Sequence, residues 1–308
     1  MQTSPLLNTS LIALLLGTSL VAAQEPPLPA QAAGLEAAGF KVHRGNPSGY
    51  RVTFGAEAVF NEASLANIAA LRDVREISGD GVGVDDAVLA KLVKAAPALE
   101  SLFINGSAIT DEGLKVLAQL PNFKHLGIHH GPKALTGKGL LALKGNQSFK
   151  SVEFGGMQGI GDETVGYLAE LPHLRAVNIY HTEHTRASLP NLVRKNPLLE
   201  KFSLNAGLRP ARMSAADILT LVPLKNLREL GLHEMDLPYE GGLVHLKQLK
   251  GLKKVSLEYS IYKDEDLAKL KAALPGVEIV STNRASEKNL ITWQERVEAM
   301  KKESVKIP

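Results

Sequence analysis

Three short segments of the sequence carry histidines close to acids or to one another. They are His129-His130, His181-Thr182-Glu183-His184 and His233-Glu234. Imidazole and carboxylate groups suit zinc, and a zinc ion held by them would support a metal-dependent hydrolase. However, no second histidine follows His233-Glu234 at the offset that the HExxH zinc motif requires. We therefore keep the metal-dependent hydrolase as an alternative and assign no metal ligand.

Two glycine-rich segments resemble nucleotide-binding loops without meeting their spacing. Five residues rather than four separate Gly131 from Gly137, and Gly139 stands where a phosphate-binding loop needs Ser or Thr. The segment 155–161 lacks the glycine spacing of a dinucleotide-binding turn. No serine lies in a nucleophile-elbow motif. The sequence thus indicates no catalytic or cofactor-binding residue, and we expect neither an enzyme nor a cofactor.

The composition excludes several classes of partner. A net charge of +3 over 308 residues, with both signs mixed along the chain, is too weak to favour nucleic acid. Aromatic residues make up only 5%, which argues against stacking surfaces for single strands. The sequence has no cysteine, so it contains neither disulfides nor thiolate metal sites. Its stability must come from its core.

The first 23 residues have the pattern of a secretory signal peptide. The apolar run 11–21 has the length of a signal core, and Val21-Ala22-Ala23 supplies small residues before Gln24. No Lys or Arg precedes the run, so a retained membrane anchor is the alternative. The run is short for a span, and residues 17–19 interrupt it. We expect a secreted or periplasmic protein with no integral membrane segment after signal removal.

A repeat of about 25 residues dominates the rest of the chain. Apolar residues recur at positions s, s+3 and s+5, as in Leu99/Leu102/Ile104 and Leu252/Val255/Leu257. The copies begin at s = 49, 74, 99, 123, 149, 174, 199, 227, 252 and 274, the first two being weaker. Positions s+3 and s+5 alternate with polar residues, which predicts a short strand in each copy. Stacking the copies would pair these strands into one parallel sheet.

A helical stretch follows the strand in most copies. Capping residues and acids open it, as at Thr110-Asp111-Glu112, Asp162-Glu163 and Asp264-Glu265-Asp266. Prolines end it before the next strand, at positions 121, 172, 197, 223 and 275. Each repeat is therefore predicted to be one strand and one helix.

The segment 99–114, LxxLxIxxxxITDEGL, resembles the leucine-rich-repeat superfamily. It is similar to the secreted bacterial type and to the cysteine-containing subtype, with small or polar residues in place of Cys. The resemblance covers about 230 residues. It implies an α/β fold, a right-handed solenoid with a concave parallel sheet, convex helices and caps at both ends. It also implies binding on the concave face and no particular reaction.

The chain divides into five predicted parts. Residues 1–23 are the signal peptide and 24–34 a disordered, proline-containing linker. Residues 35–73 form an N-terminal cap, with a hairpin around the turn at 46–49 and a helix carrying Leu65, Ile68 and Leu71. Residues 74–281 are the repeats. Residues 282–308 form a capping helix and tail whose apolar stripe includes Trp293; a partner-docking helix is the alternative.

Positions s+2, s+4 and s+6 of each repeat are predicted to point from the concave sheet into solvent, with s+7 at its rim. These positions concentrate residues suited to polar recognition. The candidate partner-binding residues are Phe103, Asn105, His129, His130, Glu153, Asn178, Tyr180, His181, Asn205, His233, Glu234, Glu258 and Tyr259.

We therefore expect a secreted or periplasmic binding or scaffold protein. Its concave face would recognise a protein, a peptide or a surface polymer. The alternatives are the hydrolase described above, acting at the histidine-rich rim of the sheet, and a self-associating structural protein of the envelope.

Overall fold

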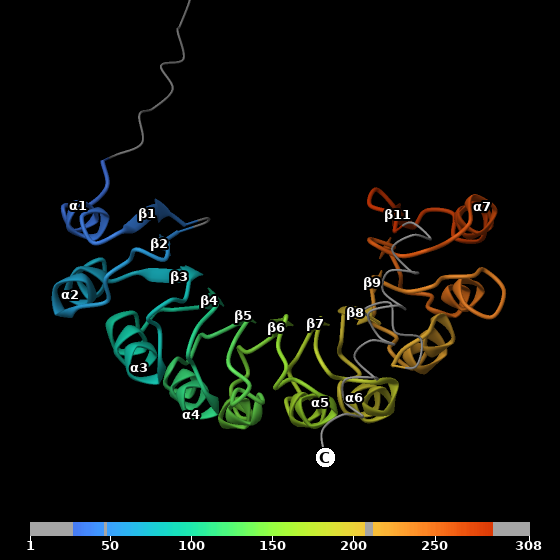
Figure 1. Cartoon of the computed structure of the whole chain (residues 1–308), viewed down its shortest axis with the longest axis horizontal. Coiled ribbons are helices and arrows are strands. Elements are labelled where there is room, and N and C mark those ends of the chain that lie inside the picture. The colour runs from blue at the N-terminus through green and yellow to red at the C-terminus, as the bar shows by residue number, and fades with distance from the viewer. Residues whose placement is uncertain (1–26, 46–47, 207–211, 286–308) are drawn as a thin grey trace, which may run out of the picture.

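The computed structural model describes residues 27–45, 48–206 and 212–285, which form an arc of stacked coils (Figure 1). The strands are β1 (Phe40–Arg44), β2 (Tyr50–Phe54), β3 (Val74–Asp80), β4 (Ser101–Asn105), β5 (His125–His129), β6 (Ser151–Gly155), β7 (Ala176–Tyr180), β8 (Lys201–Asn205), β9 (Glu229–His233), β10 (Lys254–Ser256) and β11 (Glu278–Val280). The α-helices are α1 (Gln31–Glu36), α2 (Glu62–Ala70), α3 (Asp86–Ala95), α4 (Asp111–Lys115), α5 (Asp162–Ala169), α6 (Leu189–Lys195) and α7 (Asp264–Ala273). The 3-10 helices are η1 (Val116–Gln119), η2 (Lys138–Leu143), η3 (Arg186–Ser188), η4 (Ala215–Leu221) and η5 (Leu243–Gln248).

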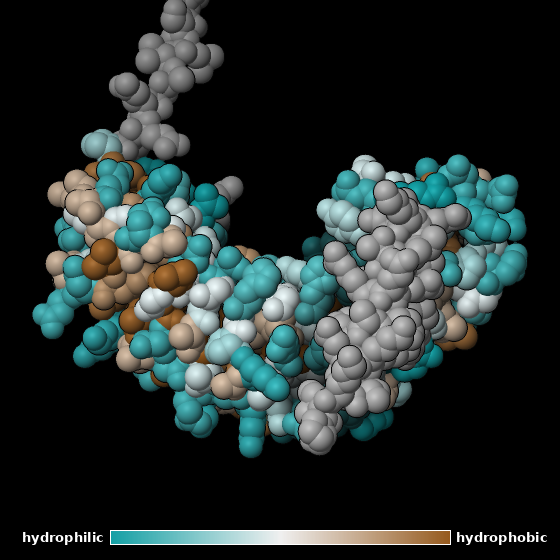
Figure 2. All heavy atoms as spheres, viewed as in Figure 1, coloured by the Kyte–Doolittle hydropathy of each residue, from teal (hydrophilic) through white to brown (hydrophobic). Residues whose placement is uncertain are grey.

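The strands form one sheet in chain order from β1 to β11. The β1–β2 pair is antiparallel and the later pairs are parallel, as the predicted hairpin and the predicted repeats require. The sheet lines the inner side of the arc and the helices form its outer side (Figure 1). A space-filling view shows that the inner side is open between the two ends of the arc (Figure 2).

The predicted repeat register is confirmed as far as β10. From Val52 to Val255 each s+3 side chain is the register partner of the next, so the aliphatic residues stack in a row through the interior. The prediction for the last copy is wrong by two residues, because Val255 pairs with Ile279 and not with Val277. Each is at most 5% exposed: Ile77, Leu102, Leu126, Val152, Val177, Phe202, Leu230 and Val255. Burying this row and the s+5 row beside it supplies much of the hydrophobic stabilisation, because an isolated coil would leave both rows in water.

Carboxylates at the starts of the helices tie neighbouring repeats together. Asp86 Oδ2 accepts a hydrogen bond from Thr110 Oγ1 at 2.6 Å, and its Oδ1 accepts one from the Thr110 amide at 2.7 Å. Asp111 binds Thr136 and Asp162 binds Thr185 in the same way, each one repeat further along. The acids that open the helices therefore also fix the stacking of one helix on the next.

The N-terminal cap contains one element more than predicted. The hairpin and α2 are present, and Asn61 caps α2 by accepting a hydrogen bond from the Ser64 amide at 2.9 Å. Helix α1, however, begins at Gln31, inside the predicted linker 24–34. Its side chains Ala32 and Leu35 are buried in the core, and this burial stabilises a short helix that composition alone does not predict.

Both predicted ends of the chain lie outside the described residues. This holds for the signal peptide 1–23 and for the Trp293 stripe in 286–308. Within the described ranges, no helix is long and apolar enough to cross a membrane.

Candidate ligand-binding face of the sheet

The concave face has an aromatic cluster in its N-terminal half. The Phe103 ring lies against Gly127 on the next strand, where any side chain would collide with it. Its centroid is 4.6 Å from that of His129, in an edge-to-face arrangement. In the same way Tyr180 lies against Gly155, where a Cβ would sit 2.5 Å from the Tyr180 ring. Glycines in the strands thus let the large side chains lie over the sheet.

His129 is the centre of a polar network that extends over three strands. Its Nε2 lies 2.8 Å from Glu153 Oε1 and 2.9 Å from the Tyr180 hydroxyl. Asn178 Nδ2 donates a hydrogen bond to the other carboxylate oxygen of Glu153 at 3.1 Å. Burial raises the pKa of Tyr180, with the Glu153 charge adding to the effect, so its hydroxyl stays protonated at neutral pH. The structure therefore brings four of the predicted residues into direct contact.

A second group lies at the ends of the strands. His130 Nδ1 is 2.8 Å from Asn105 Oδ1 of the preceding repeat. His181 Nε2 is 2.6 Å from Glu234 Oε1, although the two residues stand two repeats apart. This hydrogen bond raises the pKa of His181 and favours its charged form.

Asn205, which the sequence predicts to face solvent, is only 8% exposed. Asn205 ends β8, which lies between β7 and β9. The His181–Glu234 pair joins the ends of those two flanking strands and so passes over the end of β8.

The C-terminal repeats contribute the remaining predicted residues. His233 Nε2 is 3.2 Å from Ser256 Oγ, and burial lowers the pKa of His233, which keeps the imidazole neutral. Glu258 accepts hydrogen bonds from Thr282 and Asn283. Tyr259 makes no side-chain hydrogen bond to a described residue and is 58% exposed at the rim.

The s+7 position has a feature that the sequence did not predict. Its backbone is left-handed in six repeats, with φ between 50° and 72°. Glycine occupies it twice, at 106 and 156, and adopts this conformation without strain. In the other repeats the position carries His130, His181, Glu234 and Tyr259, for which the conformation is strained.

The histidines do not converge on a common point. His129, His181 and His233 have separate partners, and His184 is buried with its Nδ1 2.7 Å from Thr182 Oγ1. In the part of the chain that the structure describes, no group of three or more His, Asp or Glu side chains could hold a metal ion. The geometry therefore gives the hydrolase alternative no metal centre.

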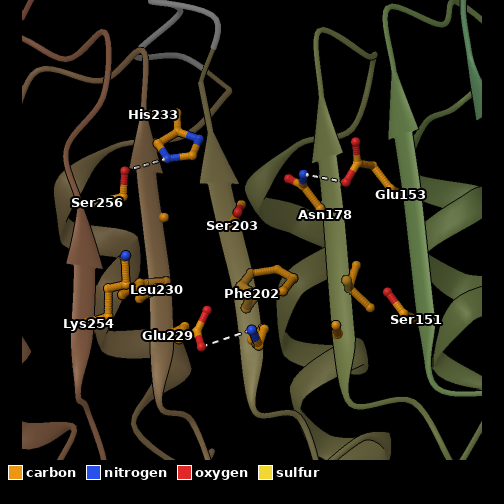
Figure 3. Close-up of a pocket in the computed structure, with 14 residues that line it drawn as sticks. Ser151, Glu153, Asn178, Phe202, Ser203, Glu229, Leu230, His233, Lys254 and Ser256 are labelled. Carbon is orange, nitrogen blue, oxygen red and sulfur yellow. Dashed lines mark hydrogen bonds and ion pairs between the residues drawn. The ribbon is translucent and has the colours of Figure 1, made fainter. Parts of the chain in front are cut away.

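A hollow of about 310 Å³ opens on the same face beside the polar network. Three predicted residues, Glu153, Asn178 and His233, line it. The candidate binding residues do not include the others whose side chains face it, which are Ser151, Lys201, Ser203, Glu229, Lys254 and Ser256. Figure 3 shows the small Ser203 between Asn178 and His233 on neighbouring strands.

Comparison with known proteins adds a structural likeness. No model of a protein family matches the chain, and neither does any curated protein. Among solved structures, a protein from Bacteroides fragilis is 19% identical, with a TM-score of 0.52 over 70% of this chain and 68% of its own. An internalin from Listeria monocytogenes is 18% identical, with a TM-score of 0.46 over 70% of this chain and 56% of its own. A chain of the yeast Rad7 and Elc1 complex is 16% identical, with a TM-score of 0.44 over 76% of this chain and 76% of its own.

The architecture is a stack of coils of about 25 residues. Each coil has a parallel strand on the concave side and a helix on the convex side. The chain has the leucine-rich-repeat fold. In this solenoid, the s+2, s+4 and s+6 side chains of successive coils form adjacent rows on one face. Comparing these rows would have revealed the hollow, because the s+4 row shrinks to Ser203, Gly231 and Ser256 in three consecutive repeats.

Proposed function

We propose that this protein is a secreted or periplasmic binding scaffold that holds a protein, a peptide or a surface polymer on its concave face. The leucine-rich-repeat fold supports the general role, because it offers a broad and rigid surface. The polar network around His129 supports the choice of face. Its members stand on strands, and their mutual hydrogen bonds keep them in place before a partner arrives.

The observation that carries the proposal is the choice of residue at s+7. A non-glycine residue in left-handed backbone costs roughly 1 kcal/mol. Gly106 shows that this position accepts glycine, yet four other repeats keep a His, Glu or Tyr there. Such strain at a surface position is typical of side chains retained for contact with a ligand.

Site-specific photo-crosslinking tests this proposal in the native host. A photoreactive amino acid replaces Tyr259, which is 58% exposed on the concave rim, or Leu219, which is 43% exposed in η4 on the convex side. We expect a discrete adduct after irradiation from position 259 and none from position 219. Adducts of equal yield from both positions, or none from 259, would place any binding surface elsewhere.

A triple substitution gives a second measurement. His129→Ala, Tyr180→Ala and His233→Ala together remove two members of the polar network and one wall of the hollow. The captured partner should be lost while the far-ultraviolet circular dichroism stays that of the unaltered chain. Retention of the partner by the folded triple variant would contradict the proposal.

A further inference from the structure

The hollow on the concave face results from a run of small side chains in the s+4 row. Register aligns Ser203 of β8 with Gly231 of β9, and Gly231 with Ser256 of β10. In the N-terminal half the same row holds Phe103, which fills the space against Gly127. Over Gly231 the Ser203 hydroxyl and the His233 imidazole lie within 2.9 Å of where a Cβ would sit, and the hollow opens beside these two side chains. The volume of about 310 Å³ lies at the lower end of the range for small-molecule sites.

The charges around the hollow balance. Lys201 and Lys254 line it together with Glu153 and Glu229. Lys201 Nζ lies 2.8 Å from Glu229 Oε1, so the charges of this pair are already satisfied. Lys254 Nζ lies 2.9 Å from Glu278 Oε1, one strand further on. Each lining lysine therefore already has a carboxylate partner, so an anion would find no unpaired ammonium group there, and Glu153 is held by His129 and Asn178.

The remaining polar groups are hydroxyls, one amide and one imidazole. Ser151 and Ser203 have no side-chain hydrogen bond to any described residue, so both hydroxyls are available to a ligand. Ser256 shares its hydroxyl with His233 at 3.2 Å and keeps further capacity. Asn178 uses its Nδ2 on Glu153, while its Oδ1 is buried without a partner. A hydroxyl group both donates and accepts hydrogen bonds. These serines therefore match a ligand whose own groups also donate and accept, as hydroxyls do.

The lining offers no apolar sub-pocket for the side chains of a peptide. Val177, Phe202 and Leu230 border the hollow, but they belong to the s+3 row that is buried in the core. A peptide bound along strands draws specificity from pockets for alternate side chains, and such pockets are absent here among the described residues.

We propose that this hollow binds a neutral saccharide unit, held by the serine hydroxyls, Glu153 and Asn178. The inference rests on the proposed function, because it takes the concave face as the binding surface and selects the polymer among its possible partners. Further units of a longer chain would extend along the open concave face.

An array of immobilised oligosaccharides tests the inference with the full chain as the probe. The array carries neutral hexose and N-acetylhexosamine oligomers, with uronic-acid and free glucosamine oligomers as charged counterparts. We expect retention on at least one neutral oligomer, which calorimetry then measures in solution. Retention only on charged oligomers, or on none of the array, overturns the inference.

Two substitutions locate the site. Ser203→Phe places at β8 and β9 the pair of residue types that Phe103 and Gly127 make at β4 and β5, and its ring fills the hollow beside the His233 imidazole that lies against Gly231. Ser78→Phe is the matched control, since Ser78 occupies the same row on β3 and does not line the hollow. Saccharide binding should disappear in the first variant and persist in the second.

Ser203→Ala with Ser256→Ala removes two hydroxyls without filling the space. We expect the dissociation constant to rise roughly tenfold or more, in line with the loss of two hydrogen bonds. Binding that survives Ser203→Phe, or that ignores the double alanine change, contradicts the site. If the array retains nothing while a protein adduct still forms at position 259, the concave face binds a partner and only the saccharide assignment fails.

Discussion

At the scale of single residues, four side chains of the concave rim stand on left-handed backbone. Tyr259, with a φ of 57°, is 58% exposed. Tyr259→Gly should relieve the backbone strain, and it removes a side chain that is more than half exposed. We expect the free energy of unfolding to rise by roughly 0.5–1 kcal/mol, measured by urea denaturation, while partner capture falls.

The reverse change provides the control. Gly106 has a φ of 72°, and the nearest atom to an added Cβ there is 3.8 Å away, so Gly106→Ala adds strain without a clash. It should lower stability by about 1 kcal/mol. If Tyr259→Gly instead destabilises the protein, the rim residues serve folding and their strain says nothing about binding.

The buried His184 leads us to expect a loss of stability in acid. It is 4% exposed, and burial lowers its pKa to about 4, with Asp162 and Glu183 opposing the shift and Arg212 adding to it. In the unfolded chain its pKa returns to about 6.5. Unfolding therefore takes up a proton between these values, and the stability present above pH 6.5 is lost as pH falls toward 4. The loss should be on the order of 3 kcal/mol at most.

The measurement compares urea unfolding of the unaltered chain and of His184→Gln from pH 8 to pH 4.5. Glutamine keeps a polar group beside Thr182 but does not titrate. We expect a constant difference in stability above pH 7 and a shallower acid fall in the variant. Parallel curves over the whole range would show that His184 does not govern acid sensitivity.

At the scale of elements, the aspartates at the helix starts couple one repeat to the next. Asp111 Oδ2 accepts a hydrogen bond from Thr136 Oγ1 at 2.6 Å, and its Oδ1 accepts one from the Gly139 amide at 3.2 Å. Asp111→Ala leaves these donors without their partner and should lower the free energy of unfolding by roughly 1–3 kcal/mol. Glu112→Ala, which breaks only the exposed ion pair with Lys115, should cost less than about 0.5 kcal/mol. If both variants lose the same free energy of unfolding, Asp111 does not couple the repeats.

The elements also show what could be predicted from the sequence. The strand register followed from the spacing of Leu102, Leu126 and Val152, because each aliphatic residue must reach the same interior row. The His181–Glu234 contact could not be predicted, since it joins residues two repeats apart and depends on the curvature of the sheet. The burial of Asn205, which is 8% exposed, could not be predicted either, because the alternation along its strand predicts an outward position.

The sequence predicted which residues face outward on the concave face, but it did not predict where this face is raised and where it is hollow. Alternation along each strand identifies the outward positions. Which of them form a rise or a hollow depends on neighbours across strands, such as Phe103 against Gly127 or Ser203 against Gly231. That comparison needs the repeats aligned side by side, with one s+4 residue read from each.

At the scale of the whole molecule, the proposed location outside the cytoplasm makes a prediction about processing. The predicted signal cleavage follows Ala23, and the first described helix, α1, begins later, at Gln31. Cleavage would therefore leave intact the buried contacts of Ala32 and Leu35 that hold α1 on the core.

The intact mass of the protein from the native host should correspond to a chain that begins at Gln24. Ala23→Arg, which places a large charged residue at the cleavage position, should keep the precursor in the membrane fraction. Full-length protein in the soluble cytoplasmic fraction would contradict the proposed location, and the search for a partner would then move inside the cell.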